Sequence, residues 1–160
     1  EYSQFKDWFA GERMQKRIKY VQEHKLLSDE HGSINTVFKI LLAHVDENKE
    51  SSYCHNDLGN SNIFATDPLT VFDPDPRFNN GYIDLGLALT YRIAHGGTPE
   101  VLSQLIKGYF NNELYNGKAL HAAILLNVYR KLPYWNRTKR LKNIKNVKDY
   151  LIKNKYLLEK

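Results

Sequence analysis

The chain has 160 residues, of which 42% are hydrophobic and 26% are charged, and its formal net charge is +5. These proportions are typical of one folded domain and exclude a disordered chain. Because no apolar run approaches the roughly 20 residues of a spanning helix and the N-terminus lacks a signal-peptide layout, we expect a cytoplasmic protein without a membrane span. The single cysteine, Cys54, excludes an internal disulfide and a cysteine-based zinc site, and we expect it to be a small buried hydrophobe.

Hydrophobic periodicity predicts two helices in the first third of the chain. The first is expected over about residues 4–26, with Gly32 in the break that follows it. The second begins at Ile34 and reaches Val45 with the i, i+3, i+4, i+7 spacing of an amphipathic helix. Ser33 is its expected N-cap.

Short runs that favour strands follow at 52–54, 63–65 and 69–72. The sequence Thr66-Asp67-Pro68 predicts a turn between the last two runs. We therefore expect a small central β-hairpin in an α+β, mostly helical, single domain that covers residues 1–160.

The remaining chain predicts helices again. Thr98 and Pro99 are expected to open one helix, and another spans about 118–132, with Pro133 closing it. Tyr134 and Trp135 are expected to pack after this proline, and stacking on a substrate is the alternative.

A basic tract begins at Arg130. From there to the C-terminus the chain has eleven Lys or Arg and only two acidic residues, Asp149 and Glu159, which gives this tract a net charge of +9 and residues 1–129 a net charge of −4. Its apolar residues recur at helical spacing, namely Leu141, Ile144, Val147 and Leu151. We interpret it as a helix with one packed side and one solvated, charged side. Binding of nucleic acid or of an anionic membrane surface through this tract is the alternative.

Polar residues of the central segment carry the chemistry. His55, Asp57 and Asn62 form the pattern H-x-D-x-x-x-x-N, and Asp73 follows the apolar pair Val71-Phe72. This is the spacing of a kinase catalytic loop. Asp57 is suited to orient a substrate hydroxyl and to take its proton. Asn62 and Asp73 offer the oxygen ligands that Mg²⁺ prefers. A polar turn without catalytic function is the alternative reading of this loop.

The segment CHNDLGNSNIFATDPLTVFDPDPRFNNGYIDLGLAL resembles the catalytic segment of the aminoglycoside phosphotransferase and choline kinase superfamily. The resemblance implies a protein-kinase-like C-terminal lobe that transfers phosphate from ATP, with Mg²⁺, to a hydroxyl of an aminoglycoside, a sugar, choline or an amino acid. It assigns catalysis to Asp57 and the metal to Asn62 and Asp73. His55 and Asp84 would support the catalytic loop, although Asp84 could also be an ordinary aspartate at a helix N-terminus.

The segment departs from the family pattern at three points. Asn56 stands where the family has glycine, and Asp75 is a second candidate for the metal carboxylate. No Gly-rich loop and no strand lysine for the nucleotide phosphates precede residue 53. We therefore expect a C-terminal lobe without its N-terminal nucleotide lobe, with Glu1 just after the hinge. The chain alone would then be inactive as a kinase.

The same reading predicts that Ile63 and Phe72 contact the nucleotide. With Phe64 they would form an apolar patch, covered by the missing lobe or by another chain.

Two other interpretations of the function stay open. A non-catalytic kinase-like binding module would keep the loop, and the basic C-terminal tract could bind nucleic acid or membrane, although no specific nucleic-acid motif is present. The remaining histidines are too far apart in sequence to form a local ligand pattern, and each is expected at the surface or at a helix cap: His24, His31, His44, His95 and His121.

Overall fold

The structure is a computed structural model, and it describes residues 2–48, 52–55, 57, 62–64, 70–71, 77–79, 81–111 and 113–158. The fold is mostly helical, as expected. In chain order the elements are α1 (Tyr2–Ala10), α2 (Glu12–Glu23), η1 (Asp29–His31), α3 (Ile34–Asn48), β1 (Ser52–Cys54), β2 (Ile63–Phe64), β3 (Thr70–Val71), β4 (Arg77–Asn79), α4 (Tyr82–Ala94), α5 (Pro99–Tyr109), α6 (Gly117–Arg137), α7 (Leu141–Asn154) and η3 (Lys155–Leu158). Among the described residues, no helix is both long and apolar enough to cross a bilayer.

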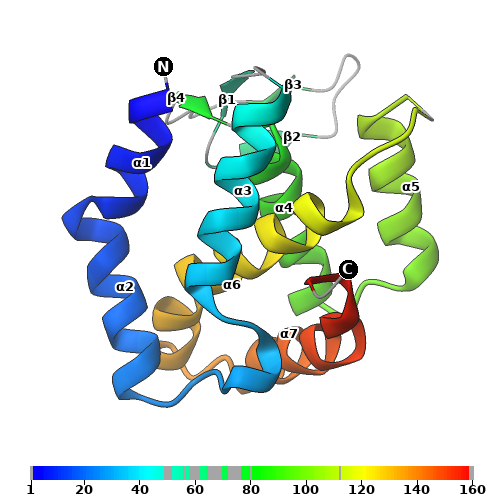
Figure 1. Ribbon diagram of the computed structural model, residues 1–160. Coiled ribbons are helices and arrows are strands. Elements are labelled where there is room, and N and C mark those ends of the chain that lie inside the picture. The colour runs from blue at the N-terminus through cyan, green and yellow to red at the C-terminus, as the bar shows by residue number, and fades with distance from the viewer. Residues whose placement is uncertain are drawn as a thin grey trace.

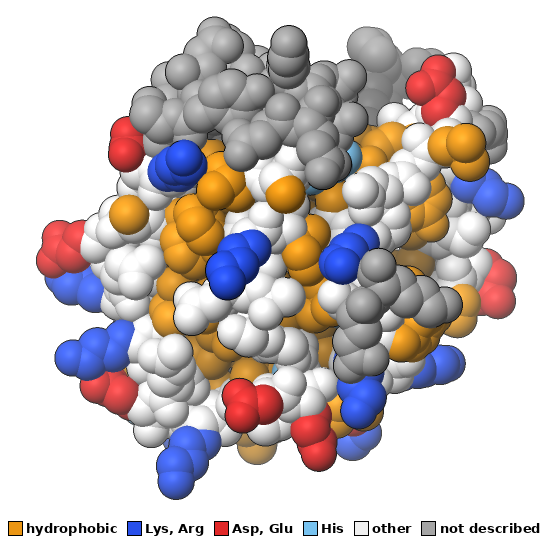
Figure 2. Space-filling model, in the orientation of Figure 1, with side chains coloured by type: hydrophobic (Ala, Val, Ile, Leu, Met, Phe, Trp, Pro, Cys, Tyr) orange, Lys and Arg blue, Asp and Glu red, His pale blue; other side chains and the backbone are white. Residues whose placement is uncertain are grey.

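Helix α6 forms the centre of the fold and packs against α2, α3, α4 and α7 (Figure 1). Fourteen of its 21 residues are buried, which explains why so many other helices can pack around it. Helices α1 and α2 lie on one side of this centre and α5 on the other. On the face shown in Figure 2, hydrophobic side chains lie between the helices, and most charged side chains project at the edges.

Helices α4 and α6 approach each other closely because small residues meet at their crossing. A Cβ atom on Gly86 would lie only 2.7 Å from the carbonyl carbon of Ala123. Beside this contact, the buried hydroxyl of Thr90 donates to the Gly86 carbonyl at 2.6 Å and reaches the Ile124 carbonyl at 3.3 Å. The close approach also fixes the position of Asp84, which lies in the first turn of α4.

The strands form two small antiparallel pairs. β1 pairs with β4, with Tyr53 opposite Phe78, and β2 pairs with β3, with Ile63 opposite Val71. β2 and β3 lie within the segments expected to form a hairpin, but the expected turn between them lies outside the described residues, so the hairpin stays a prediction. Cys54 at the end of β1 is buried, as expected for a small apolar side chain.

Two predicted helix boundaries were wrong. The expected helix over about residues 4–26 is two helices, because Gly11 adopts an extended conformation and becomes the N-cap of α2. The Gln15 side chain then donates to the Phe9 carbonyl and satisfies the end of α1. Pro133 lies inside α6, which continues to Arg137. Burial of Pro133 and Trp135 in this last turn offsets the backbone hydrogen bond that the proline cannot make.

The caps and the histidines also differ in part from expectation. The Ser33 hydroxyl accepts from the Asn35 N–H, as a cap should, whereas Thr98 makes no side-chain cap bond. Among the histidines, His31 is buried although it does cap η1, and His121 is buried inside α6 with 1% of its surface exposed. His121 lies there because its position on α6 faces the core, where its ring stacks on Tyr150 of α7.

Helix α7 packs one side of the basic tract onto the body of the protein. Ile144, Val147 and Leu151 are buried, as the spacing predicts. Leu141, at the start of the helix, is 66% exposed, so its predicted packing was wrong. The Asn146 amide donates to the Ala94 carbonyl at the end of α4, which fixes α7 against that helix.

Candidate active site

Asp84 holds the backbone at the start of the loop that follows β1. It lies in the first turn of α4 and is 8% exposed. Its Oδ2 accepts a hydrogen bond from the backbone N–H of His55 at 2.6 Å. A buried carboxylate near a helix N-terminus is favoured by the helix dipole, and a charged acceptor strengthens the bond. This contact is the one that a supporting role for Asp84 requires.

His55 and Asn62 together fix the position of Asp57. The ring Nδ1 of His55 accepts from the backbone N–H of Asp57 at 3.3 Å. The buried amide of Asn62 donates to the Asp57 carbonyl at 2.9 Å and to its Oδ2 at 3.2 Å. Because the amide nitrogen of Asn62 faces Asp57, its amide oxygen is directed elsewhere. That oxygen is the atom a magnesium ligand would use.

Lys131 of α6 approaches the other oxygen of the same carboxylate. Its Nζ lies 3.6 Å from Asp57 Oδ1, with the two side chains 18% and 45% exposed. The ammonium group also lies 4.9 Å from the ring centroid of Tyr91 on α4. Asp57 is therefore open to solvent, yet it is held between an amide on Oδ2 and a cation on Oδ1.

Asn127 links α6 to the residue that precedes Asp84. Its fully buried amide nitrogen donates to the Ile83 carbonyl at 2.9 Å, and its oxygen accepts from the Arg130 guanidinium at 2.7 Å. The Arg130 guanidinium also lies over the Trp8 ring, 5.5 Å from the centroid. These contacts connect α6, α4 and the loop into one network around Asp57.

Arg17 lies within electrostatic reach of Arg130, and Arg13 and Arg137 lie within reach of Arg17. We call the set Arg13, Arg17, Arg130, Lys131 and Arg137 the α2–α6 cation cluster. Burial, and next the charge of Arg17, lower the pKa of Arg130 to about 10. Burial, and next the charges of Arg13 and Arg137, lower the pKa of Arg17. Asp57 acts in the opposite direction and raises the pKa of both Arg17 and Arg130. The cluster is therefore within electrostatic reach of the candidate catalytic carboxylate.

The structure brings four of the predicted site residues together: His55, Asp57, Asn62 and Asp84. Asp73, its alternative Asp75, and Phe72 lie outside the described residues, and Ile63 is described through its backbone only. The convergence of Asp57, Asn62 and Asp73 on one cleft thus stays a prediction. In the part of the chain that is described, no group of three or more His, Cys, Asp or Glu side chains is placed to hold a metal ion.

Sequence reasoning missed Lys131, Arg130 and Asn127 as members of the site. A signal was present, because these polar residues lie within or directly after the long apolar segment that forms the buried part of α6. Polar and charged side chains in such a stretch are costly unless they are paired or hydrogen-bonded. Their partners, Asp57 and the Ile83 carbonyl, are distant in sequence and could not be identified from it.

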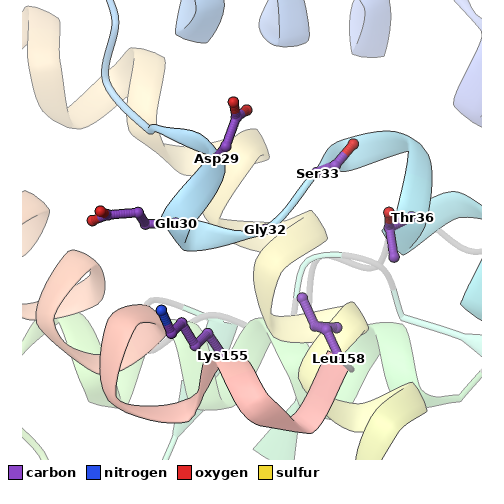
Figure 3. A pocket seen from close by; sticks show the side chains of 7 residues that line it. All are labelled: Asp29, Glu30, Gly32, Ser33, Thr36, Lys155 and Leu158. Atoms are coloured by element: carbon purple, nitrogen blue, oxygen red, sulfur yellow. The ribbon is translucent and has the colours of Figure 1, made fainter. Parts of the chain in front are cut away.

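A separate hollow of about 400 Å³ lies between η1, the start of α3 and η3. Its charged lining residues are Asp29, Glu30 and Lys155, and Figure 3 shows the two carboxylates pointing in different directions. Since no hydrogen bond or ion pair among the described residues joins its charged groups across the hollow, it offers a weaker candidate site than Asp57.

Comparisons with models of known protein families, with curated proteins and with solved structures find no match to this chain.

Proposed function

We propose that residues 53–90 carry the catalytic loop of an ATP-dependent phosphotransferase, and that the chain is a kinase-like C-terminal lobe. The acceptor is a hydroxyl of a small molecule, of the aminoglycoside, sugar, choline or amino-acid type. The observation that supports this most is the setting of Asp57, with Asn62 on one carboxylate oxygen and the other turned toward α6. A merely polar turn does not require a buried carboxylate, Asp84, to hold the backbone next to it.

In this proposal Asp57 orients the acceptor hydroxyl and takes its proton as the hydroxyl oxygen attacks the γ-phosphorus and the bond to ADP breaks. Asp84 and His55 act indirectly, because they hold the backbone from which Asp57 extends. Asn62 and Asp73 would hold Mg²⁺, and the amide oxygen of Asn62 fits a hard cation. When bound, the ion neutralises charge on the nucleotide phosphates.

The parts that cover the nucleotide are, in this proposal, supplied from outside residues 1–160. The sequence before residue 53 contains no Gly-rich loop and no strand lysine, and helices α1 to α3 occupy that segment. The nucleotide-facing residues Ile63 and Phe72 would then meet a second lobe or another chain. Catalysis is accordingly tested in the protein encoded by the whole gene.

The experiment is acceptor-dependent transfer from ATP in the presence of Mg²⁺, with a panel of the four acceptor types. A new phosphate-ester signal in ³¹P NMR, matched by ADP formation, identifies the acceptor. Asp57→Asn should reduce the turnover at least ~100-fold, since it removes the proton acceptor. Asp149→Asn, at an exposed acid of α7, is the control and should leave the turnover unchanged. No ester with any acceptor, or equal turnover in Asp57→Asn, would contradict the proposal.

A further inference from the structure

We propose that the acceptor carries an anionic group, a phosphate or a carboxylate, and that the α2–α6 cation cluster binds this group beside Asp57. The inference rests on the function proposed above and restricts the chemical class of the acceptor molecule. Among the acceptor types that the family resemblance allows, it favours sugar phosphates and amino acids and disfavours choline and aminoglycosides, which are cations.

The two carboxylate oxygens of Asp57 have different neighbours. Oδ2 faces Asn62, the residue assigned to the metal and hence to the nucleotide side of the site. The other oxygen, Oδ1, lies 3.6 Å from the Nζ of Lys131 on α6. A base that takes the proton of the acceptor hydroxyl must lie within hydrogen-bond reach of that hydroxyl. The space next to Oδ1 and Lys131 is therefore the acceptor side.

Positive charge exceeds negative charge next to Oδ1 of Asp57. Lys131 lies 3.6 Å from Asp57, and Arg17 and Arg130 are within electrostatic reach of the same carboxylate, while Asp84 acts on Arg130. Arg13 and Arg137 each repel Arg17, since a neighbouring positive charge makes protonation of Arg17 less favourable. A bound anion would relieve this repulsion, whereas a cationic acceptor would add to it.

Neighbouring side chains already hold Arg130 and Lys131 in position. Asn127 and the Trp8 ring fix the Arg130 guanidinium, and Tyr91 lies against the Lys131 ammonium. On the α2 side, Arg17 is partly buried, which limits the directions its side chain can take. Binding to positioned groups costs less conformational entropy than binding to mobile surface lysines.

The test is titration of the chain with inorganic phosphate at constant ionic strength, followed by ¹H–¹⁵N NMR of the backbone. Phosphate should bind saturably and shift signals of α2, α6 and Asp57, while choline and glucose should not. Lys131→Gln and Arg17→Gln should each weaken phosphate binding at least ~10-fold. Asp57→Asn should instead strengthen it several-fold, because it removes the carboxylate that repels the anion.

Lys16→Gln provides the matched control, because Lys16 neighbours Arg17 on α2 but is exposed and pairs with Glu12. Its phosphate affinity should equal that of the wild type. Equal weakening by Lys16→Gln and Lys131→Gln would show a diffuse charge effect and overturn the inference, as would saturable binding of choline or no saturable binding of phosphate. Thermal unfolding of each variant confirms that the compared proteins are folded.

In the protein encoded by the whole gene, competition with Mg·ADP distinguishes an acceptor group from the nucleotide phosphates. If Mg·ADP displaces phosphate from the cluster, the cations serve the nucleotide and the inference is wrong. The phosphate titration does not depend on turnover, so its failure is separate from that of the proposed function. Loss of phosphate binding with intact Asp57-dependent transfer rejects only the anionic acceptor, and normal transfer by Asp57→Asn rejects the kinase mechanism itself.

Discussion

Replacing Gly86 by alanine should destabilise the protein because α4 and α6 are in contact at that residue. The added Cβ would lie 2.7 Å from the carbonyl carbon of Ala123 and 2.9 Å from its Cβ. Carbon atoms in favourable contact are about 3.5–4.0 Å apart, so the helices must separate by roughly 1 Å. Overpacking of this kind costs about 1–3 kcal/mol, and the better helix propensity of alanine returns about 0.5–1 kcal/mol. The midpoints of these ranges give a net loss of roughly 1 kcal/mol in the free energy of unfolding.

Gly108→Ala is the matched control, because Gly108 lies in α5 and no described atom lies within 4 Å of the position that its Cβ would take. There the propensity gain acts alone, so the free energy of unfolding should rise by up to about 1 kcal/mol. Urea unfolding followed by circular dichroism measures both variants, and opposite signs are expected at equal m-values. A Gly86→Ala variant as stable as the wild type would refute the close packing of α4 on α6.

Three further results are expected. Burial lowers the pKa of His121 to about 4, below its usual 6.5, so between these two pH values the unfolded state binds more protons than the folded state. The free energy of unfolding should therefore fall by up to about 3 kcal/mol from pH 7 to pH 4. Urea titrations at both pH values should show this loss, and His121→Phe should reduce it. Asp84→Asn should weaken a charge-assisted bond and cost about 1–3 kcal/mol, with faster hydrogen exchange at the His55 amide; unchanged exchange would count against the bond. The exposed side of α7 should bind duplex DNA weakly, and binding measured at 50 and 200 mM salt should fall steeply; tight, salt-resistant, sequence-selective binding would contradict the solvated-face interpretation.

The sequence predicts best where one side of a helix is apolar. The spacing in α3 and α7 marks their buried sides, because residues three and four apart share a face of a helix. In helix α4 nine of the thirteen residues are buried, so burial extends beyond one face, and no bounds are predicted for this helix from the sequence. Tertiary packing decides in such segments.

Local rules fail where long-range contacts override them. Pro133 is a helix breaker in isolation, yet α6 continues because Leu132 and Trp135 on either side of it are buried in the core. In the candidate site, the local spacing predicts that Asp57 and Asn62 act together, and they are in contact. Lys131 lies 74 positions beyond Asp57, so their proximity depends on the packing of α6 and could not be read from the spacing.

The most direct test of the central claim separates turnover from nucleotide binding in Asp57→Asn, using the protein encoded by the whole gene. If Asp57 is the group that takes the acceptor proton, turnover falls at least ~100-fold while the Kd of Mg·ADP stays within about twofold of the wild-type value. Such a pair of values would place Asp57 in the chemical step. Turnover that survives the substitution, or a loss of turnover that only follows a loss of Mg·ADP affinity, would contradict the account.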